Sequence, residues 1–368
     1  MINLVKTFIF ITCFSWFQIN AFSSTTSYRI AFYNVENLFD YFDDTLKNDN
    51  AFTPRGMNNW TKLRYESKLK NLYKVITALN ADIIGLCEIE NKKVLLDLTR
   101  GTPLRNNNYG FIHYESADSR GIDVAMIYRK DRIKILESKP IHFIIPPDTI
   151  SKTRDFLYAK MLLYEHNFNK LNNSANYNSY FDTLHLIICH FPSKYGGLMA
   201  TKDKRMQAGK LVRSVVDSIY FNANIPQKYQ NSIHSYENFL NILIMGDFND
   251  EATDESILYG IGAICEDTLN LHNDDIINLN CFTKNSCGTH KYQDTWSFID
   301  QIMVSSALFK GTNNLSLKTK FTTIFDASFL LMRDDKYFGV KPFRTYLGMK
   351  YQGGYSDHLP VFIDIEHL

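Results

Sequence analysis

The chain has 368 residues, of which 45% are hydrophobic and 21% are charged. This composition supports a packed core and excludes a largely disordered chain. The formal net charge is only +1, which excludes recognition of nucleic acid through a broad basic surface. A nucleic-acid partner would have to be bound by a local patch or through a metal ion.

The first residues have the pattern of a secretory signal. Lys6 precedes an apolar run from Phe8 to Phe17, and the small residue Ala21 follows at a suitable cleavage position. The alternative is a buried first strand or helix. No stretch approaches the roughly 18 apolar residues of a transmembrane helix. We therefore expect residues 1–21 to be removed and the protein to be exported, to the periplasm, the cell surface or the medium.

Short apolar runs of strand length recur along the rest of the chain. Several have no polar face, which is typical of sheets that are covered on both sides. The predicted strands span residues 29–35, 82–88, 122–129, 184–190, 241–247, 299–305 and 358–365. Residues 62–80 and 202–220 carry apolar side chains at helical spacing, which predicts two amphipathic helices.

Polar segments separate these elements. The Asn-rich stretch 166–181 is predicted to be an exposed insertion, and so are 222–238 and 330–355. The length allows two domains, but no linker separates two regions of different composition. We therefore expect one domain, from about residue 25 to residue 368.

The cysteines are too widely spaced for a zinc site or a dense disulfide framework. Cys87 and Cys189 lie inside apolar runs and are interpreted as small core residues. Cys281 and Cys287 lie in a polar segment, where they could pair in an oxidising compartment.

Polar residues stand at the ends of the predicted strands. Four runs end in Asn34, Glu88, His190 and Asp247 with Asn249, and the last two begin with Asp300 and the pair Asp357 and His358. If the last two strands run antiparallel to the others, all these side chains share one rim. Acids gathered there repel one another unless a cation joins them, and oxygen ligands suit Mg²⁺ or Mn²⁺.

Each of these residues also has a simpler interpretation. The GDFN turn that contains Asp247 is compatible with a plain hairpin, and Glu88 with a surface acid. His190 is compatible with a hydrogen-bonded core histidine, and Asp300 with a turn cap.

The order of the motifs is far more specific than any one of them. The chain contains NVENLFD, LCEIEN, RGIDVAMIYR, CHFPSKYGG, GDFND, IDQI and GYSDHLPV in that order. This series resembles the endonuclease/exonuclease/phosphatase superfamily, and its secreted bacterial endonuclease-like branch in particular, over residues 28–365. The resemblance implies a deoxyribonuclease I-like α/β fold, a four-layered sandwich of two mixed sheets flanked by helices.

The resemblance also implies roles for the residues that bind metal and water. Glu88 would ligate Mg²⁺ or Mn²⁺, assisted by Asn34 and Asp357. Asp247 would orient or deprotonate the attacking water, and Asn249 would fix the phosphate. The implied reaction is in-line attack of water on a phosphate ester.

The histidines would act on the phosphate itself. By the same resemblance, His358 would polarise a non-bridging oxygen, with its ring held by Asp300. His190 would lie on the opposite side, near the leaving oxygen. Asp123 is expected to hydrogen-bond His190, with a plain strand-end acid as the alternative.

The substrate class rests on a local basic segment. Lys194, Lys202, Lys204 and Arg205 follow His190 closely. We expect Lys194 and Arg205 to bind phosphates that flank the scissile one, with a solvated helix face as the alternative. This favours an endonuclease with nucleic acid as its substrate, and no stable protein partner is implied. The competing hypotheses are a lipid or inositol-phosphate hydrolase of the same fold and a non-catalytic binding module.

Overall fold

A computed structural model describes residues 26–148, 150, 152–164, 182–224, 240–266, 270–284 and 288–368. The predicted signal, residues 1–21, and the predicted insertion 166–181 lie outside these ranges. Within them, no helix is long and apolar enough to cross a membrane.

The first sheet is built around β1. Its strands follow the order β14 (Leu315–Leu317), β20 (Val361–His367), β1 (Ser27–Leu38), β2 (Ile83–Ile89), β4 (Asp123–Arg129) and β3 (Tyr109–His113), and β15 (Thr323–Ile324) also pairs with β20. β1 runs parallel to β2 and antiparallel to β20. The sheet is therefore mixed.

The second sheet is mixed as well. Its order is β5 (Ile133–Ile141), β6 (Phe156–Leu163), β7 (Asp182–His190), β8 (Asn241–Asp247), β13 (Asp300–Ser305), β10 (Ile276–Asn278) and β9 (Ala263–Ile264). β7 and β8 are parallel, whereas β13 is antiparallel to β8. The register places His190 and Asp300 on either side of Asp247. The predicted shared rim is thus explained by the reversed direction of β13 and β20.

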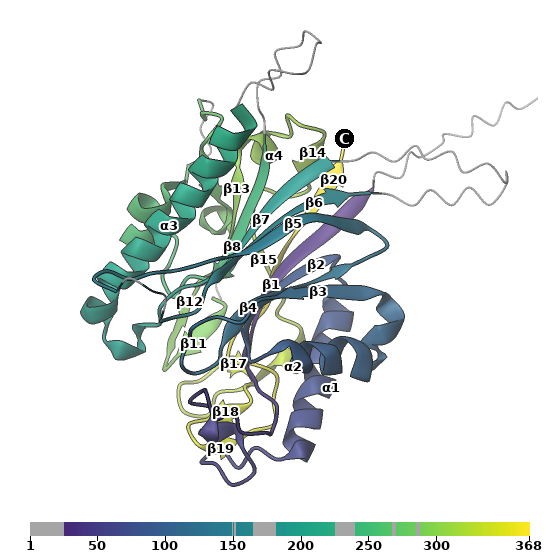
Figure 1. Cartoon of the computed structure of the whole chain (residues 1–368), viewed down its shortest axis with the longest axis vertical. Helices are drawn as coiled ribbons and strands as arrows, with labels where there is room; N and C mark the ends of the chain where they lie inside the picture. The colour runs from purple at the N-terminus through teal and green to yellow at the C-terminus, as the bar shows by residue number, and fades with distance from the viewer. Residues whose placement is uncertain are drawn as a thin grey trace, which may run out of the picture.

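The two sheets pack face to face with helices outside, as Figure 1 shows. Gly85 of β2 marks their close approach, because a Cβ there would lie 2.7 Å from Met245 Cε of β8. α3 (Leu198–Asn224) covers the second sheet. Its Ala208, Val212 and Val216 pack against that sheet in an apolar cluster that is separate from the main core. The result is the predicted four-layered α/β sandwich, with buried apolar side chains between successive layers.

The helices begin and end where local chemistry favours it. α1 (Lys62–Leu79) is capped by the Thr61 hydroxyl, which accepts from Arg64 N, and it ends at Asn80 in the left-handed conformation, φ 50°. Both predicted helices are confirmed, and α3 is longer than predicted at each end. The other helices are α2 (Lys92–Leu96), α4 (Ser306–Lys310) and short turns at Asn50–Phe52, Asp97–Gly101, Pro103–Asn107, Lys194–Gly196, Ser256–Ile261, Leu279–Phe282 and Ser328–Leu330.

The segment 330–355 is not the simple exposed insertion that its composition suggests. It forms two small hairpins, β16 (Leu331–Arg333) with β17 (Val340–Pro342) and β18 (Tyr346–Leu347) with β19 (Lys350–Tyr351). The buried Lys68 Nζ of α1 donates to Thr345 Oγ1 and to the Tyr355 carbonyl, both at 2.6 Å. Contacts far apart in sequence therefore tie the segment to the fold. A further hairpin pairs β11 (His290–Tyr292) with β12 (Thr295–Ser297).

The pair that the sequence allowed, Cys281 with Cys287, is not formed. Cys281 is bonded to Cys265, not to Cys287, which lies outside the described residues. β9 and β10 are parallel neighbours, so the segments that follow them emerge at the same end. Cys265 directly follows β9 and Cys281 follows β10, which brings their Cα atoms to 5.3 Å. Cys87 and Cys189 are free and buried, as expected.

Candidate active site

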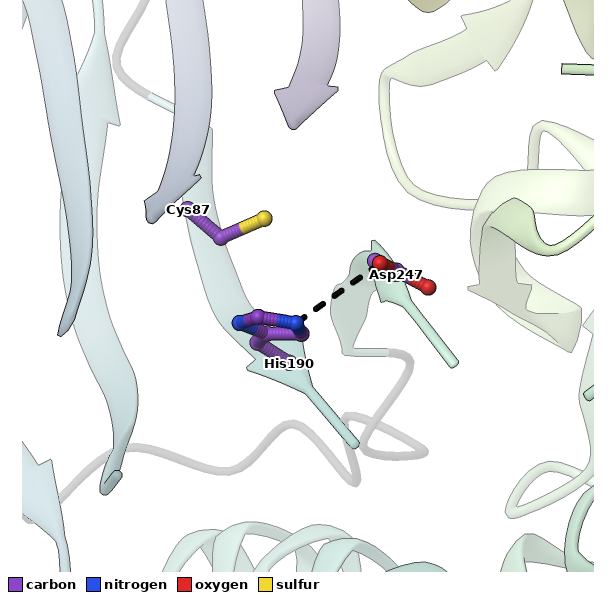
Figure 2. A group of neighbouring side chains, drawn as sticks. All are labelled: Cys87, His190 and Asp247. Carbon is purple, nitrogen blue, oxygen red and sulfur yellow. Dashed lines mark ion pairs between the residues drawn. The ribbon is translucent and has the colours of Figure 1, made fainter. Parts of the chain in front are cut away.

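The site is centred on Asp247, the last residue of β8. Its Oδ2 lies 3.7 Å from His190 Nε2 on β7 and 3.9 Å from His358 Nε2, just before β20. Asp300 Oδ2 bonds His358 Nδ1 at 2.7 Å and so fixes the orientation of that ring. The structure therefore brings together four of the predicted catalytic residues, which come from both sheets. Figure 2 shows His190 and Asp247 facing each other.

The environment of Asp247 and His358 keeps a proton in the site. Burial disfavours charge on His358, but Asp300 and Asp247 outweigh it and hold the pKa of His358 well above its usual range. Burial raises the pKa of Asp247 to about 7, with repulsion from Asp300 adding to the effect and His358 opposing it. At neutral pH, His358 is therefore an imidazolium that can donate a hydrogen bond.

His190 is in the opposite protonation state. Burial, followed by the charges of Arg154 and Arg120, holds the pKa of His190 well below its usual range. Arg154 is itself buried, and its guanidinium donates to the carbonyls of His190 and Phe191. The two histidines that flank Asp247 thus differ in charge, which is the usual basis for dividing acid and base roles. Nothing in the local sequence around Arg154 indicated this position.

Glu88 and Asn34 approach the site from the first sheet. Glu88 has φ 63° at an irregularity in the pairing of β2 with β4, and Oε1 lies 4.0 Å from His190 Nε2. Asn34 Nδ2 donates to Asp247 Oδ2 at 3.0 Å and to Glu88 Oε1 at 3.4 Å. Asn34 Oδ1 accepts from the backbone of Glu36. In this arrangement Asn34 links the two carboxylates through its amide nitrogen.

Asp357 is paired with an arginine that sequence reasoning missed. Arg344 Nη2 donates to Asp357 Oδ2 at 2.7 Å, and Arg344 also contacts the buried Glu36. Burial opposes ionisation of Asp357, but Arg344, His358 and His290 together outweigh it and lower the Asp357 pKa. Burial, and then Asp357, raises the pKa of Glu36 to about 7. Arg344 lies in the segment 330–355. The polar composition of this segment predicts an exposed insertion and gives no indication of the pairing with Asp357.

His290 was also missed. It forms an isolated bridge with His358, and the two ring centroids are 4.9 Å apart. His290 Nε2 lies 4.0 Å from Asp357 Oδ2. Burial, with His358 next in size, lowers the pKa of His290 to about 4, so His290 is neutral beside a charged ring.

Asn249 lies at the mouth of the site. Its backbone N donates to Asp247 Oδ1 at 3.0 Å, and its φ of 50° turns the chain sharply after β8. The Nδ2 of Asn249 donates to the Phe191 carbonyl. Asn249 therefore links the segments that follow β7 and β8.

Comparison with known proteins assigns the chain to a family. Residues 29–367 match the Endonuclease/Exonuclease/phosphatase family. The chain belongs to this family. No curated protein matches the sequence. The family match covers nearly the whole described chain.

Solved structures of low identity share the endonuclease/exonuclease/phosphatase fold. A Bacteroides thetaiotaomicron protein of this family superposes with a TM-score of 0.53 at 16% identity, covering 94% of this chain and 99% of that one. A humanized D. rerio TDP2 gives 0.51 at 17%, covering 92% and 98%. A B. thetaiotaomicron mannosyl-6-phosphatase gives 0.52 at 15%, covering 92% and 99%. At these identities the likeness establishes the fold.

The expected bond between Asp123 and His190 is not formed. Asp123 Oδ2 bonds His113 Nε2 at 3.1 Å, and Oδ1 accepts from Ser116 N. Among the residues that the structure describes, His190 Nδ1 has no hydrogen-bond partner. The edge strand β3 places His113 beside Asp123, whereas His190 belongs to the other sheet. The prediction failed because the pairing of β3 with β4 gives Asp123 another histidine as its partner.

The two predicted phosphate ligands are engaged elsewhere. Arg205 is 1% exposed, and its Nε forms an ion pair with Asp250 Oδ2 at 2.8 Å. Lys194 Nζ lies 3.1 Å from Asp250 Oδ1 and 3.4 Å from Asp254 Oδ2. Arg205 is turned inward by the helical period of α3 and cannot reach a substrate. Lys194 retains partial exposure but is held by two acids.

A stability measurement tests this correction. Arg205→Ala should lower the free energy of unfolding by about 3 kcal/mol, because it removes the buried partner of Asp250. Lys202→Ala is a control from the same helix, since its solvent-exposed pair with Glu255 should contribute little to stability. Urea unfolding measures both. An unchanged unfolding midpoint with weakened DNA binding would restore Arg205 as a phosphate ligand.

The donor set of this family member suits a hard divalent cation. Glu88 and Asp357 have side chains that are 19% and 20% exposed, so both carboxylates open to solvent. Asp247 and Asp300 lie directly behind them, and one oxygen of Asp300 has no hydrogen-bond partner in the described part of the chain. Several carboxylates crowded at one rim favour a bound cation with oxygen ligands.

Proposed function

We propose that this protein is a divalent-metal-dependent hydrolase of phosphate esters. The observation that carries the proposal is the presence of a charged His358 and a neutral His190 that both lie within 4 Å of Asp247 Oδ2. A phosphate between two such groups meets a proton donor on one side and a proton acceptor on the other. The metal dependence is part of the proposal and rests on the carboxylates at the rim.

The residues divide the work in the following way. His358, held by Asp300, donates to a non-bridging phosphate oxygen and stabilises the charge that develops there. Asp247 accepts the proton of the attacking water. His190 lies across Asp247 on the leaving-group side. Glu88 would hold the cation, with Asp357 beside it, and the cation would neutralise charge on the phosphate.

For the substrate, we propose a nucleic-acid phosphodiester cleaved internally. A cavity of about 420 Å³ adjoins Pro192, two residues after His190, and is lined by Lys152 and Lys204. The exposed Lys204 can meet a flanking phosphate, which Arg205 cannot. Support also comes from the fold, since D. rerio TDP2 was solved in complex with a single strand DNA product.

We propose export through residues 1–21, which N-terminal sequencing of the exported protein would test.

A second candidate is a phosphatase for small phosphorylated polyols, such as an inositol phosphate or the head of a lipid. A polar cavity of about 210 Å³ lies beside Arg344 and is lined by Glu36, Asn58 and Tyr346. Its size suits a small ring better than a nucleic-acid strand. One protein of similar fold is a mannosyl-6-phosphatase.

A substrate panel separates the two candidates. The enzyme is incubated with plasmid, single-stranded DNA, RNA, sphingomyelin, inositol phosphates and mannose 6-phosphate, with Mg²⁺ and with chelator. We expect Mg²⁺-dependent conversion of supercoiled plasmid to nicked and linear forms. Hydrolysis of the small phosphates alone would favour the second candidate. Activity that survives the chelator would contradict the metal dependence.

Salt dependence tests the phosphate contact. Lys204→Ala should reduce the slope of log affinity against log salt by about 0.9 on duplex DNA, because one released counterion is lost. Lys210→Ala is a matched control, being exposed on the same helix away from the cavity. Hydrolysis of a small phosphodiester should be unchanged in both variants. Equal slopes for the two variants would remove Lys204 from the nucleic-acid interface.

A further inference from the structure

A buried thiol lies inside the catalytic cluster. Cys87 ends the regular part of β2, and its side chain points toward His190 and Asp247, as Figure 2 shows. One donor atom from each of the three residues lies within 4.8 Å of the other two. Sequence analysis assigned Cys87 to the core, which is correct for its burial but omits these neighbours.

The separation of His190 from Asp247 fits a metal site better than a hydrogen bond. His190 Nε2 and Asp247 Oδ2 are 3.7 Å apart, which is too long for a hydrogen bond. Ligand atoms about 2.0–2.3 Å from a tetrahedral zinc ion lie roughly 3.3–3.8 Å from one another. His190 is 3% exposed, and its Nδ1 finds no hydrogen-bond partner in the described ranges.

The donor atoms of this cluster favour a different class of ion from the one that the rim carboxylates favour. Thiolate and imidazole prefer Zn²⁺ and Cd²⁺, whereas Mg²⁺ prefers oxygen ligands. We propose that Cys87, His190 and Asp247 form a second cation site, specific for thiophilic divalent ions such as Zn²⁺ or Cd²⁺. An ion held there occupies His190 and Asp247 and therefore inhibits hydrolysis. The inhibition rests on the proposed function, but the binding does not.

A partly exposed carboxylate adjoins this site. Glu88 follows Cys87 in the chain, is open to solvent, and has its Oε1 4.0 Å from His190 Nε2. An ion that enters past this carboxylate meets negative charge from Glu88 and then from Asp247. The fourth position of a tetrahedral ion can be taken by water.

The chain supplies a matched control thiol. Cys189 is as buried as Cys87 and directly precedes His190. Alternate residues of a strand point to opposite faces, and Cys189 packs in the apolar cluster under α3 with Ile187 and Val212. Cys189 therefore has the same burial and chemistry without the neighbouring donors.

The test measures binding in the absence of substrate. Cd²⁺ is titrated into the protein in excess Mg²⁺, and the ultraviolet charge-transfer absorption of a cadmium–thiolate bond is followed. We expect a band that saturates at one equivalent in the wild type and in Cys189→Ser, and that is lost in Cys87→Ser and Cys87→Ala. Zn²⁺ affinity by calorimetry should fall at least about tenfold in the Cys87 variants only. Circular dichroism confirms that each variant is folded.

The possible outcomes distinguish a failure of the cation site from a failure of the proposed function. A band that persists in the folded Cys87 variants, or that disappears in Cys189→Ser, overturns the proposal, and so does the absence of a band in the wild type. If the band depends on Cys87 but no phosphate ester is hydrolysed, the site stands and the proposed function fails. If hydrolysis is observed and Zn²⁺ inhibits wild type and Cys87→Ser equally, the inhibitory role is wrong.

Discussion

Asp247→Asn is expected to lower kcat by about 10³-fold or more on any phosphate ester that the protein hydrolyses. The amide keeps the shape of the side chain, but it cannot accept a proton from water. His358→Ala should have a loss of similar size, because its proton stabilises charge on the same phosphate. The double variant should lose little more than either single one, since residues that act on one transition state are not additive.

A stability measurement distinguishes this loss of catalysis from a loss of folding. The pKa of Asp247 is raised to about 7 in the folded protein, above its ordinary value of 3.8, so its ionised form disfavours the folded state once the pH exceeds about 4. Asp247→Asn removes that cost, and its thermal midpoint at pH 8 should equal or exceed that of the wild type. Asp203→Asn, on the exposed face of α3, is the control for both measurements. A loss of activity below tenfold, or two losses that multiply, would contradict the assignment.

Glu88→Gln should weaken Mg²⁺ binding by at least about 100-fold, more than the 10–100-fold typical of outer-shell partners. The amide retains the size of the side chain and removes the negative charge that a hard cation requires. Isothermal titration of Mg²⁺ without substrate measures the effect directly. Activity should fall in parallel and recover in part at high Mg²⁺.

Glu90→Gln provides a closely matched control. Glu90 lies two residues further along the chain, is buried, and accepts from Asp40 N at 2.6 Å. Burial raises its pKa to about 8, so it is largely protonated at pH 7 and an amide resembles it well. Unchanged Mg²⁺ affinity in Glu88→Gln, or an equal loss in Glu90→Gln, would remove Glu88 from the metal site.

The segment 330–355 shows where reasoning from composition fails. Its many polar residues predict exposure, yet Lys68 and Glu36 are buried against it and Arg344 pairs with Asp357. A polar side chain is expected at the surface only if no partner is available inside. In the sequence, Arg344 is 308 residues from Glu36 and 13 residues from Asp357.

Sequence patterns alone predict the family, the two long helices and the polar strand ends at Asn34, Glu88, His190 and Asp247. These features are local, because apolar periodicity and turn chemistry are set by neighbouring residues. Which charged side chains pair with one another depends on the tertiary packing. Asp123 bonds His113 because β3 pairs with β4, and Arg205 is buried because α3 turns it toward Asp250. Partner choice depends on the packing of distant segments, since a charge is satisfied by whichever opposite charge the fold brings within reach.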